Sequence, residues 1–164
     1  RLFDKLSVED NVKIGLHNQM RYGAAAGVLR LPGYWNGERR QHEKALELLS
    51  IFDLQDLAGV RAGSLPYGAQ RRLEIVRALA TNPSLLLLDE PAAGMNTTEK
   101  VELSETILRI KDRGFTVLLV EHDMKLVSGI CEQLTVLNFG TELAKGDTAA
   151  VLNDPAVIKA YIGE

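Results

Sequence analysis

The stretch Leu85-Leu86-Leu87-Leu88-Asp89-Glu90-Pro91 joins a short apolar run to two adjacent carboxylates. An apolar run that ends at a turn-forming proline is typical of a buried strand. If the strand belongs to a parallel sheet, its carboxyl end lies at the edge where open α/β folds bind ligands. One carboxylate there suits a Mg²⁺ ion that bridges nucleotide phosphates, and its neighbour can orient or deprotonate an attacking water. Two acids that merely cap a buried strand would give the same stretch, so both interpretations stay open at this point.

A second apolar run, residues 116–120, predicts a neighbouring buried strand, and the polar-faced segment 98–113 before it predicts a helix. Strand, crossover helix and strand together form a parallel βαβ unit. The triplet 121–123 directly follows the second strand, so we expect His122 to lie beside Glu90. A neutral imidazole there can donate a hydrogen bond to a phosphate and hold a water. A histidine after a strand is usually a polar loop residue, but its place opposite the acidic pair favours a functional role.

The rest of the chain predicts helices and loops before Pro83, and strands alternating with helices after it. The predicted elements are helices at 7–19, 38–52 and 68–81, a glycine-rich loop or broken helix over 22–37, a hairpin of strands 133–139 and 141–145, and short helices at 148–152 and 155–162. Alternating strands and helices around a parallel pair indicate the α/β class.

Composition narrows the classes of function. The chain has 164 residues, 46% of them hydrophobic and 25% charged, which is ordinary for a globular domain and not for a disordered or collagen-like chain. A formal net charge of -3 gives no support for a nucleic-acid or anionic-membrane partner. The single cysteine, Cys131, excludes an internal disulfide and a cysteine zinc cluster. No apolar run approaches the roughly 20 residues that cross a bilayer.

A third stretch, Ser64-Leu65-Pro66-Tyr67-Gly68-Ala69-Gln70-Arg71-Arg72, forms a turn just before the predicted helix 68–81. Backbone N–H groups at the start of a helix, together with a glycine that allows close approach, can bind an anion. A plain capped helix with a basic first turn has the same pattern. The residues alone do not choose between the two interpretations.

In order and spacing, these motifs resemble those of the ATP-binding cassette ATPases. The resemblance places the family's signature sequence at Leu65 to Ala69, its Walker B motif at Leu85 to Glu90, its D-loop at Ala93 to Asn96 and its switch histidine at His122. The finer wording, Asp-Glu-Pro-Ala-Ala-Gly-Met-Asn from Asp89 and Val-Glu-His-Asp-Met from Val120, is similar to the ATPase subunits of branched-chain amino acid importers. It implies a partial P-loop NTPase fold, with a helical, signature-bearing subdomain over 1–82 and the C-terminal part of the catalytic core over 83–164.

The resemblance also implies ATP and Mg²⁺ as ligands and assigns roles to three residues of the strand ends. Asp89 would help to coordinate Mg²⁺. Glu90 would be the general base or the carboxylate that orients the attacking water, and His122 would contact the γ-phosphate. The bound nucleotide would therefore be hydrolysed at the edge where both predicted strands end.

Five further residues are expected to bind nucleotide from a second subunit. By resemblance, Ser64, Leu65, Gly68 and Ala69 of the signature would act in trans on ATP held by that subunit, and Asn96 of the D-loop would link the two sites. The usual signature serine and first glycine are here Pro66 and Tyr67, and proline offers neither N–H nor hydroxyl. The phosphate contact is therefore expected from Gly68 N–H, from Ser64 or from the helix end.

The pattern Gly-x-x-x-x-Gly-Lys-Ser/Thr, which cradles phosphates in this family, does not occur in these 164 residues, nor does a glutamine placed as the family's Q-loop requires. We therefore expect the chain, which starts at Arg1, to be the C-terminal portion of a nucleotide-binding domain and to bind ATP poorly by itself. A non-catalytic fragment or interaction module of an ABC-type protein remains the alternative function. A repair or chromosome-associated ATPase would require long heptads or a basic face, and the sequence has neither.

For the whole protein, the resemblance implies an ATPase that couples ATP hydrolysis to import, held peripherally on the cytoplasmic face of the cell membrane. The expected partners are a second ATPase subunit in a homo- or heterodimer, transmembrane permease subunits and, indirectly, a periplasmic or extracellular substrate-binding protein, with no nucleic acid. Residues 22–35, which end in Tyr34 and Trp35, are the expected contact with the membrane-spanning partner, although a buried aromatic pair is the commoner explanation of such residues.

Overall fold

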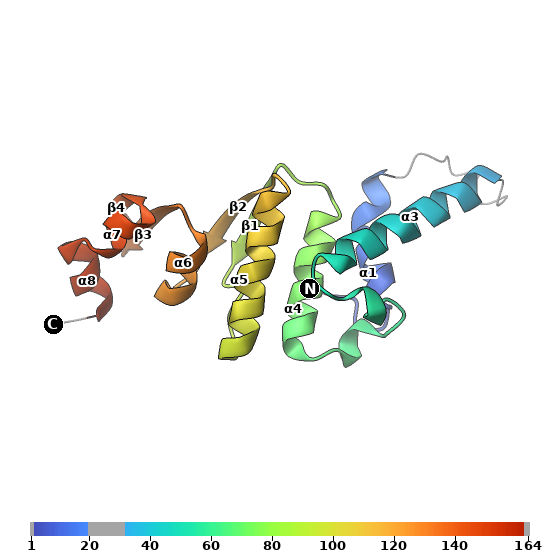
Figure 1. Ribbon diagram of the computed structural model, residues 1–164, viewed down its shortest axis with the longest axis horizontal. Helices are drawn as coiled ribbons and strands as arrows, with labels where there is room; N and C mark the ends of the chain where they lie inside the picture. The colour runs from blue at the N-terminus through green and yellow to red at the C-terminus, as the bar shows by residue number, and fades with distance from the viewer. Residues whose placement is uncertain (1, 20–31, 163–164) are drawn as a thin grey trace.

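The computed structural model describes residues 2–19 and 32–162. The described part is elongated: the N-terminal helices lie at one end, and the last two strands with the C-terminal helices lie at the other (Figure 1). In chain order the elements are α1 (Val8–Leu16), the 3₁₀ turn η1 (His17–Gln19), α3 (Pro32–Ser50), the 3₁₀ turns η2 (Gln55–Leu57) and η3 (Ala62–Ser64), α4 (Tyr67–Leu79), β1 (Leu85–Asp89), α5 (Thr97–Asp112), β2 (Thr116–Val120), α6 (Met124–Ile130), β3 (Gln133–Asn138), β4 (Thr141–Asp147), α7 (Thr148–Leu152) and α8 (Pro155–Ile162).

Helices α1, α3 and α4 form the helical end of the molecule. Helix α1 begins at an N-cap, because the backbone N–H of Asp10 donates to Ser7 Oγ at 3.0 Å. The predicted apolar stripes face inward, and the fully buried side chains on these helices include Val8, Val12, Leu49, Leu73 and Val76. The predicted helices of this half are therefore present, with ends shifted by a few residues.

The prediction for residues 22–37 was wrong over its last part. Helix α3 begins at Pro32, so residues 32–37 are helical, while residues 20–31 lie outside the described part of the chain. Proline suits the first turn of a helix because the first N–H groups have no intrahelical partner. Trp35 is 58% exposed and lies 5.3 Å from Tyr34 in an edge-to-face contact, so burial does not explain this tryptophan.

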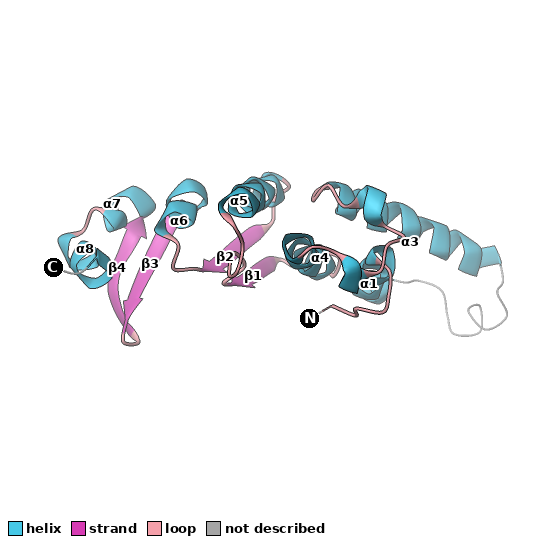
Figure 2. Ribbon diagram, turned by 90° about the horizontal axis from the view of Figure 1, so that it is seen from below, coloured by secondary structure: helices cyan, strands magenta, loops and turns pink. Residues whose placement is uncertain are grey.

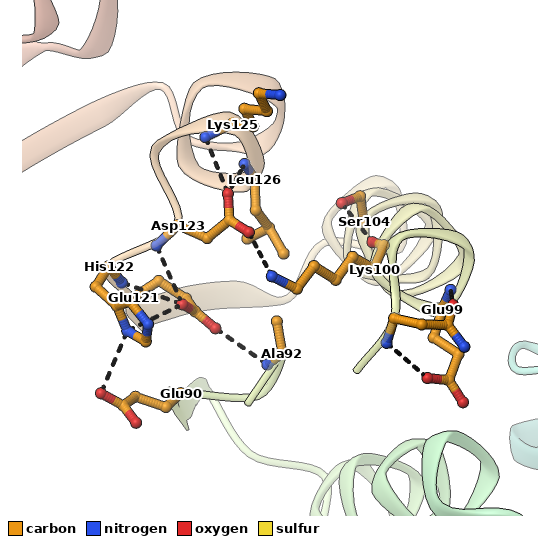
Figure 3. A network of polar contacts seen from close by, with 11 residues as sticks. Glu90, Ala92, Glu99, Lys100, Ser104, Glu121, His122, Asp123, Lys125 and Leu126 are labelled. Carbon is orange, nitrogen blue, oxygen red and sulfur yellow. Dashed lines mark hydrogen bonds and ion pairs between the residues drawn. The ribbon is translucent and has the colours of Figure 1, made fainter. Parts of the chain in front are cut away.

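Strands β1 and β2 form the predicted parallel pair, with α5 as the crossover helix. The register runs from Leu85 opposite Thr116 to Asp89 opposite Val120, so both strands end at the same edge. Helices α5, α6 and α7 lie on one side of the strands (Figure 2). Their placement brings the start of α6 to the edge where β1 and β2 end (Figure 3).

The prediction that both strands are buried was correct for only one face. Leu86 and Leu88 are 3% and 8% exposed, because they point toward the helical layer. The alternate side chains Leu87 and Leu118 are 65% and 55% exposed. Among the described residues, no helix lies over this second face (Figure 2). A parallel sheet is normally covered on both faces, and the described part of the chain covers one.

The C-terminal end holds the antiparallel hairpin β3–β4 and a small core of its own. Val136, Val151 and Val157 from β3, α7 and α8 bury one another. The predicted bounds of α7 and α8 are confirmed, whereas the short helix α6 was not predicted. Within residues 2–19 and 32–162, no helix combines the length and the apolarity that a membrane crossing requires.

Candidate functional site

Asp89 and Glu90 lie at the carboxyl end of β1, and both are exposed. The backbone N–H of Glu90 donates to the carbonyl of Val120 at 2.9 Å, so the pairing with β2 continues one residue past the strand. Glu90 has a φ of +43°, in the left-handed region that non-glycine residues rarely adopt. Residues in such unfavourable backbone conformations are often found where a functional site requires a particular orientation of the side chain.

His122 lies directly beside Glu90. Its Nδ1 is 3.4 Å from Glu90 Oε1, and the side chains of the two residues are 71% and 55% exposed (Figure 3). Both groups therefore face solvent, where a substrate can reach them. The structure brings together the two residues that the ends of the predicted strands placed at one edge.

A third carboxylate, Glu121, supports this pair from below the surface. Its side chain is only 1% exposed. Oε1 accepts a hydrogen bond from the backbone N–H of Ala92 at 3.0 Å, and Oε2 accepts one from the N–H of His122 at 3.1 Å (Figure 3). No pattern in the sequence singles out this residue, because its partner Ala92 lies 29 positions away in the chain.

Asp123 anchors the loop that carries His122 to the helical layer. Its Oδ1 accepts hydrogen bonds from the backbone N–H groups of Lys125 and Leu126 and so caps α6. Its Oδ2 accepts a hydrogen bond of 2.7 Å from Lys100 Nζ on α5. This hydrogen bond from Lys100 is the main reason why the pKa of Asp123 lies below its usual value, and it raises the pKa of Lys100.

The signature residues lie at the start of α4 and along the turn before it. Ser64 is exposed and donates from Oγ to the carbonyl of Arg61 at 2.8 Å, whereas Leu65 and Ala69 are buried. Gly68 is buried against α5: a Cβ built on it would lie 2.5 Å from Glu99 Oε1. The backbone of α4 therefore approaches the start of α5 as closely as only glycine allows.

Asn96 is the N-cap of α5 and not a free side chain. Its Oδ1 accepts from the N–H of Glu99 at 3.0 Å, and its own N–H donates to Glu99 Oε2 at 2.9 Å, which makes a capping box. The D-loop prediction therefore falls on a rigid helix start. This capping box lies against Gly68, so the structure joins the predicted signature and D-loop residues.

The predicted site residues thus form two clusters, one of Asp89, Glu90 and His122 and one of the signature with Asn96. Among the described residues, no hydrogen bond or ion pair joins Glu90 or His122 directly to Gly68. The turn after β1 links the two clusters, because the Tyr67 hydroxyl donates to the carbonyl of Ala93 at 3.1 Å.

The donor set fits Mg²⁺ through a single carboxylate. Within the described ranges, no group of three or more histidine, cysteine, aspartate or glutamate side chains could enclose a metal ion. Mg²⁺ usually keeps several waters and binds one or two carboxylates together with substrate phosphates. Asp89, an exposed carboxylate at the edge of the sheet, is the residue that would hold it.

Known proteins resemble this chain in sequence over its whole length. The chain is 42% identical over 165 aligned positions to the high-affinity branched-chain amino acid transport ATP-binding protein LivG of Escherichia coli (strain K12), covering 100% of this chain and 65% of LivG. It is 41% identical to the corresponding protein BraF of Pseudomonas aeruginosa, again with 65% of that protein covered. The chain therefore spans about 65% of the length of these curated relatives.

The fold also has counterparts among solved structures. The crystal structure of an ATP-binding cassette of an ABC transporter in its ADP conformation superimposes with a TM-score of 0.78 at 30% identity, over 98% of this chain and 64% of that one. The sequence profile described as "ABC transporter" matches residues 1–93, which is more than half of the 164 residues. The predicted α/β fold of the cassette ATPases is thereby confirmed, and the chain belongs to the ABC transporter family.

Proposed function

We propose that these residues are part of the ATP-hydrolysing subunit of an importer for branched-chain amino acids. The pair of Glu90 and His122, 3.4 Å apart at the common edge of β1 and β2, is the observation that carries the proposal. The substrate class rests on relatives whose names describe branched-chain amino acid transport.

In this proposal Glu90 acts as the base or orienting group for water. Its carboxylate is exposed and adjoins His122 Nδ1, so one face of the carboxylate remains available to a water molecule. Nε2 of His122 lies outside this contact and would donate to the terminal phosphate, an arrangement in which both ring nitrogens of His122 carry a proton. Mg²⁺ on Asp89 would neutralise the charge of the phosphates.

The signature cluster would serve ATP held by a second subunit. The first-turn N–H groups of α4, including that of Gly68, have no intrahelical partners and lie at the positive end of the helix dipole. Pro66, the N-cap of this helix, offers no side-chain hydrogen bond, so the phosphate contact falls to the backbone of Gly68 and to Ser64. Leu65 and Ala69 would hold this turn through their burial, and Asn96 would join it to the other site.

We extend the proposal to the partners and the location of the whole protein. A second ATPase subunit would complete each site, and permease subunits would hold the protein peripherally at the cytoplasmic face of the membrane. An extracytoplasmic binding protein would act only through the permease. Residues 1–82 would form the helical subdomain and residues 83–164 the later half of the catalytic core.

Replacement of Glu90 by glutamine in the full-length protein tests the mechanism. We expect Glu90→Gln to lower the rate of ATP hydrolysis by about 100-fold or more, since a positioned general base contributes at least that factor. ATP affinity should stay nearly the same, because glutamine keeps the size of the side chain. The matched control is Glu132→Gln, which neutralises an exposed carboxylate paired with Lys111 away from the strand ends and should leave turnover unchanged. Undiminished turnover in Glu90→Gln would remove Glu90 from the mechanism.

A non-catalytic interaction module is the second candidate function. It is favoured by the lack of the phosphate-cradling pattern Gly-x-x-x-x-Gly-Lys-Ser/Thr in these 164 residues. Calorimetry of these 164 residues with Mg-ATP tests whether they bind the nucleotide by themselves. Binding in the micromolar range, about -8 kcal/mol, would show that the residues present suffice to hold the nucleotide.

A further inference from the structure

We propose that Glu121 is a positioning residue that holds the turn after β1 and the loop after β2 at a fixed separation and thereby aligns Glu90 with His122. Its effect on turnover rests on the proposed function. Its effect on the two loops rests on the geometry alone.

The carboxylate of Glu121 is buried and is used on both of its oxygens. With 1% of the side chain exposed, water cannot satisfy it. Oε1 accepts the N–H of Ala92 at 3.0 Å, and Oε2 accepts the N–H of His122 at 3.1 Å and, more weakly, that of Asp123 at 3.5 Å. A buried carboxylate is stable only when it is hydrogen-bonded in this way, and charge-assisted bonds to N–H groups are stronger than neutral ones.

These bonds continue the sheet beyond the point where its backbone ladder stops. The last backbone bond between the two chain segments runs from the N–H of Glu90 to the carbonyl of Val120. Past it the segments diverge into separate turns, and the Glu121 side chain bridges them from the His122 side to Ala92 (Figure 3). The turn that carries Glu90 is therefore fixed at two points. The N–H of Glu90 donates to Val120, and the N–H of Ala92, two residues later, donates to the Glu121 carboxylate.

No neighbouring group among the described residues duplicates this bridge. The two carboxylate oxygens of Asp123 accept hydrogen bonds from the start of α6 and from Lys100. Asp123 therefore fixes the loop to the helical layer and not to the turn after β1. Glu90 and His122 themselves are separated by 3.4 Å and are both exposed, so their own contact is open to water. The alignment of the pair thus depends on Glu121.

Glu121→Gln is the sharpest variant because it keeps the shape of the side chain. An amide has one accepting oxygen and one NH₂ group, and the NH₂ group would face a backbone N–H. The variant can therefore satisfy either Ala92 or His122, but not both. We expect hydrogen exchange at one of these two amides to become at least 10-fold faster in the nucleotide-free, full-length protein.

Kinetics of the same protein separate positioning from a general loss of structure. We expect Glu121→Gln to lower kcat for ATP hydrolysis at least 10-fold while ATP binding changes less than 2-fold. Added to Glu90→Gln, it should lower the residual rate further by less than 2-fold, because a residue that acts through Glu90 has little left to act on.

Lys100→Met is the matched control, since it breaks the contact with Asp123 in the same network but leaves the Glu121 bonds in place. It should lower thermal stability without faster exchange at Ala92. Wild-type exchange at both Ala92 and His122 in Glu121→Gln would overturn the bridge. Two results would overturn the alignment of Glu90. One is faster amide exchange in Glu121→Gln with the kcat of wild type. The other is a double variant with Glu90→Gln in which the two losses of rate multiply in full. A wild-type protein that does not hydrolyse ATP would refute the proposed function alone, because the exchange measurement needs no nucleotide.

Discussion

At the scale of single residues, Tyr67 connects the start of α4 to the turn after β1. Its hydroxyl donates to the carbonyl of Ala93 and accepts a hydrogen bond of 2.9 Å from Arg71 Nε. Its ring lies against Gly94, whose φ of +75° is one that glycine adopts freely. The side chain that replaces the family's usual small signature residue is therefore used in the fold.

Removal of that hydroxyl should weaken the folded protein. We expect Tyr67→Phe to lower the free energy of unfolding by about 1 kcal/mol, because it deletes the bond to Ala93 and leaves Arg71 with one partner fewer. Tyr161→Phe is the control: both tyrosines are 46% exposed, and Tyr161 lies on α8, far from this turn. Urea denaturation of both variants measures the difference, and equal stability of the two would contradict the role given to the Tyr67 hydroxyl.

The ion pair of Asp123 and Lys100 should make the stability of the fold depend on pH in the acidic range. Since the pKa of Asp123 is lower in the folded state than its usual 3.8, the pair stabilises the fold above that pH, and the stabilisation is lost as pH falls through the lower, folded-state pKa. Asn still caps a helix well, so Asp123→Asn removes the ion pair and keeps the cap of α6.

We expect wild type to be more stable than Asp123→Asn at neutral pH, and the difference to shrink below about pH 4. Thermal unfolding at several pH values measures it. In the Lys100→Met background the same substitution should have a much smaller effect. A difference that stays constant down to pH 2 would show that the carboxylate charge does not matter.

At the scale of elements, Gly68 sets how closely α4 approaches α5. A side chain here would push Glu99 away, and Glu99 is held by the capping box with Asn96. We expect Gly68→Ala to lower the free energy of unfolding by about 1 kcal/mol, the usual value of a lost cap. Gly129→Ala on α6, where nothing lies within 4 Å of the added carbon, should be neutral or stabilising. Thermal melts compare the two, and a neutral Gly68→Ala would mean that Glu99 moves aside without cost.

Strong periodic segments made the strand pair and α5 predictable, and with them the meeting of Glu90 and His122 at one edge. The start of α3 was missed because the glycines of residues 22–37 favour a loop or a broken helix, although the helix begins at Pro32, within that segment. Helix α6 has only 7 residues, too few for a period to show. The bond from Glu121 to Ala92 joins residues 29 positions apart, and no local pattern reports such a contact.

At the scale of the whole molecule, the uncovered face of the β1–β2 sheet determines whether the chain associates with itself in solution. Leu85, Leu87, Leu118 and Val120 are 46%, 65%, 55% and 57% exposed and lie on two adjacent strands. Contiguous apolar patches of this kind favour association. The 164 residues, studied by themselves, should therefore self-associate through this face.

The double variant Leu87→Lys with Leu118→Glu tests this expectation. The two residues are register partners, so the new charges would lie side by side and make the face polar. We expect the variant to be shifted toward monomer in sedimentation velocity. Val101→Lys, on the outer side of α5 and 54% exposed, should associate like wild type. Equal association of all three proteins would point to another surface.

The left-handed backbone at Glu90 makes folding stability and catalysis favour different residues at this position. Glycine would adopt its φ of +43° at little cost, and so, to a lesser degree, would asparagine. Neither residue carries a carboxylate. A chain that drifted toward greater stability at this position would therefore gain robustness and lose its proposed base in the same step, which makes Glu90 a place where thermostability and turnover compete.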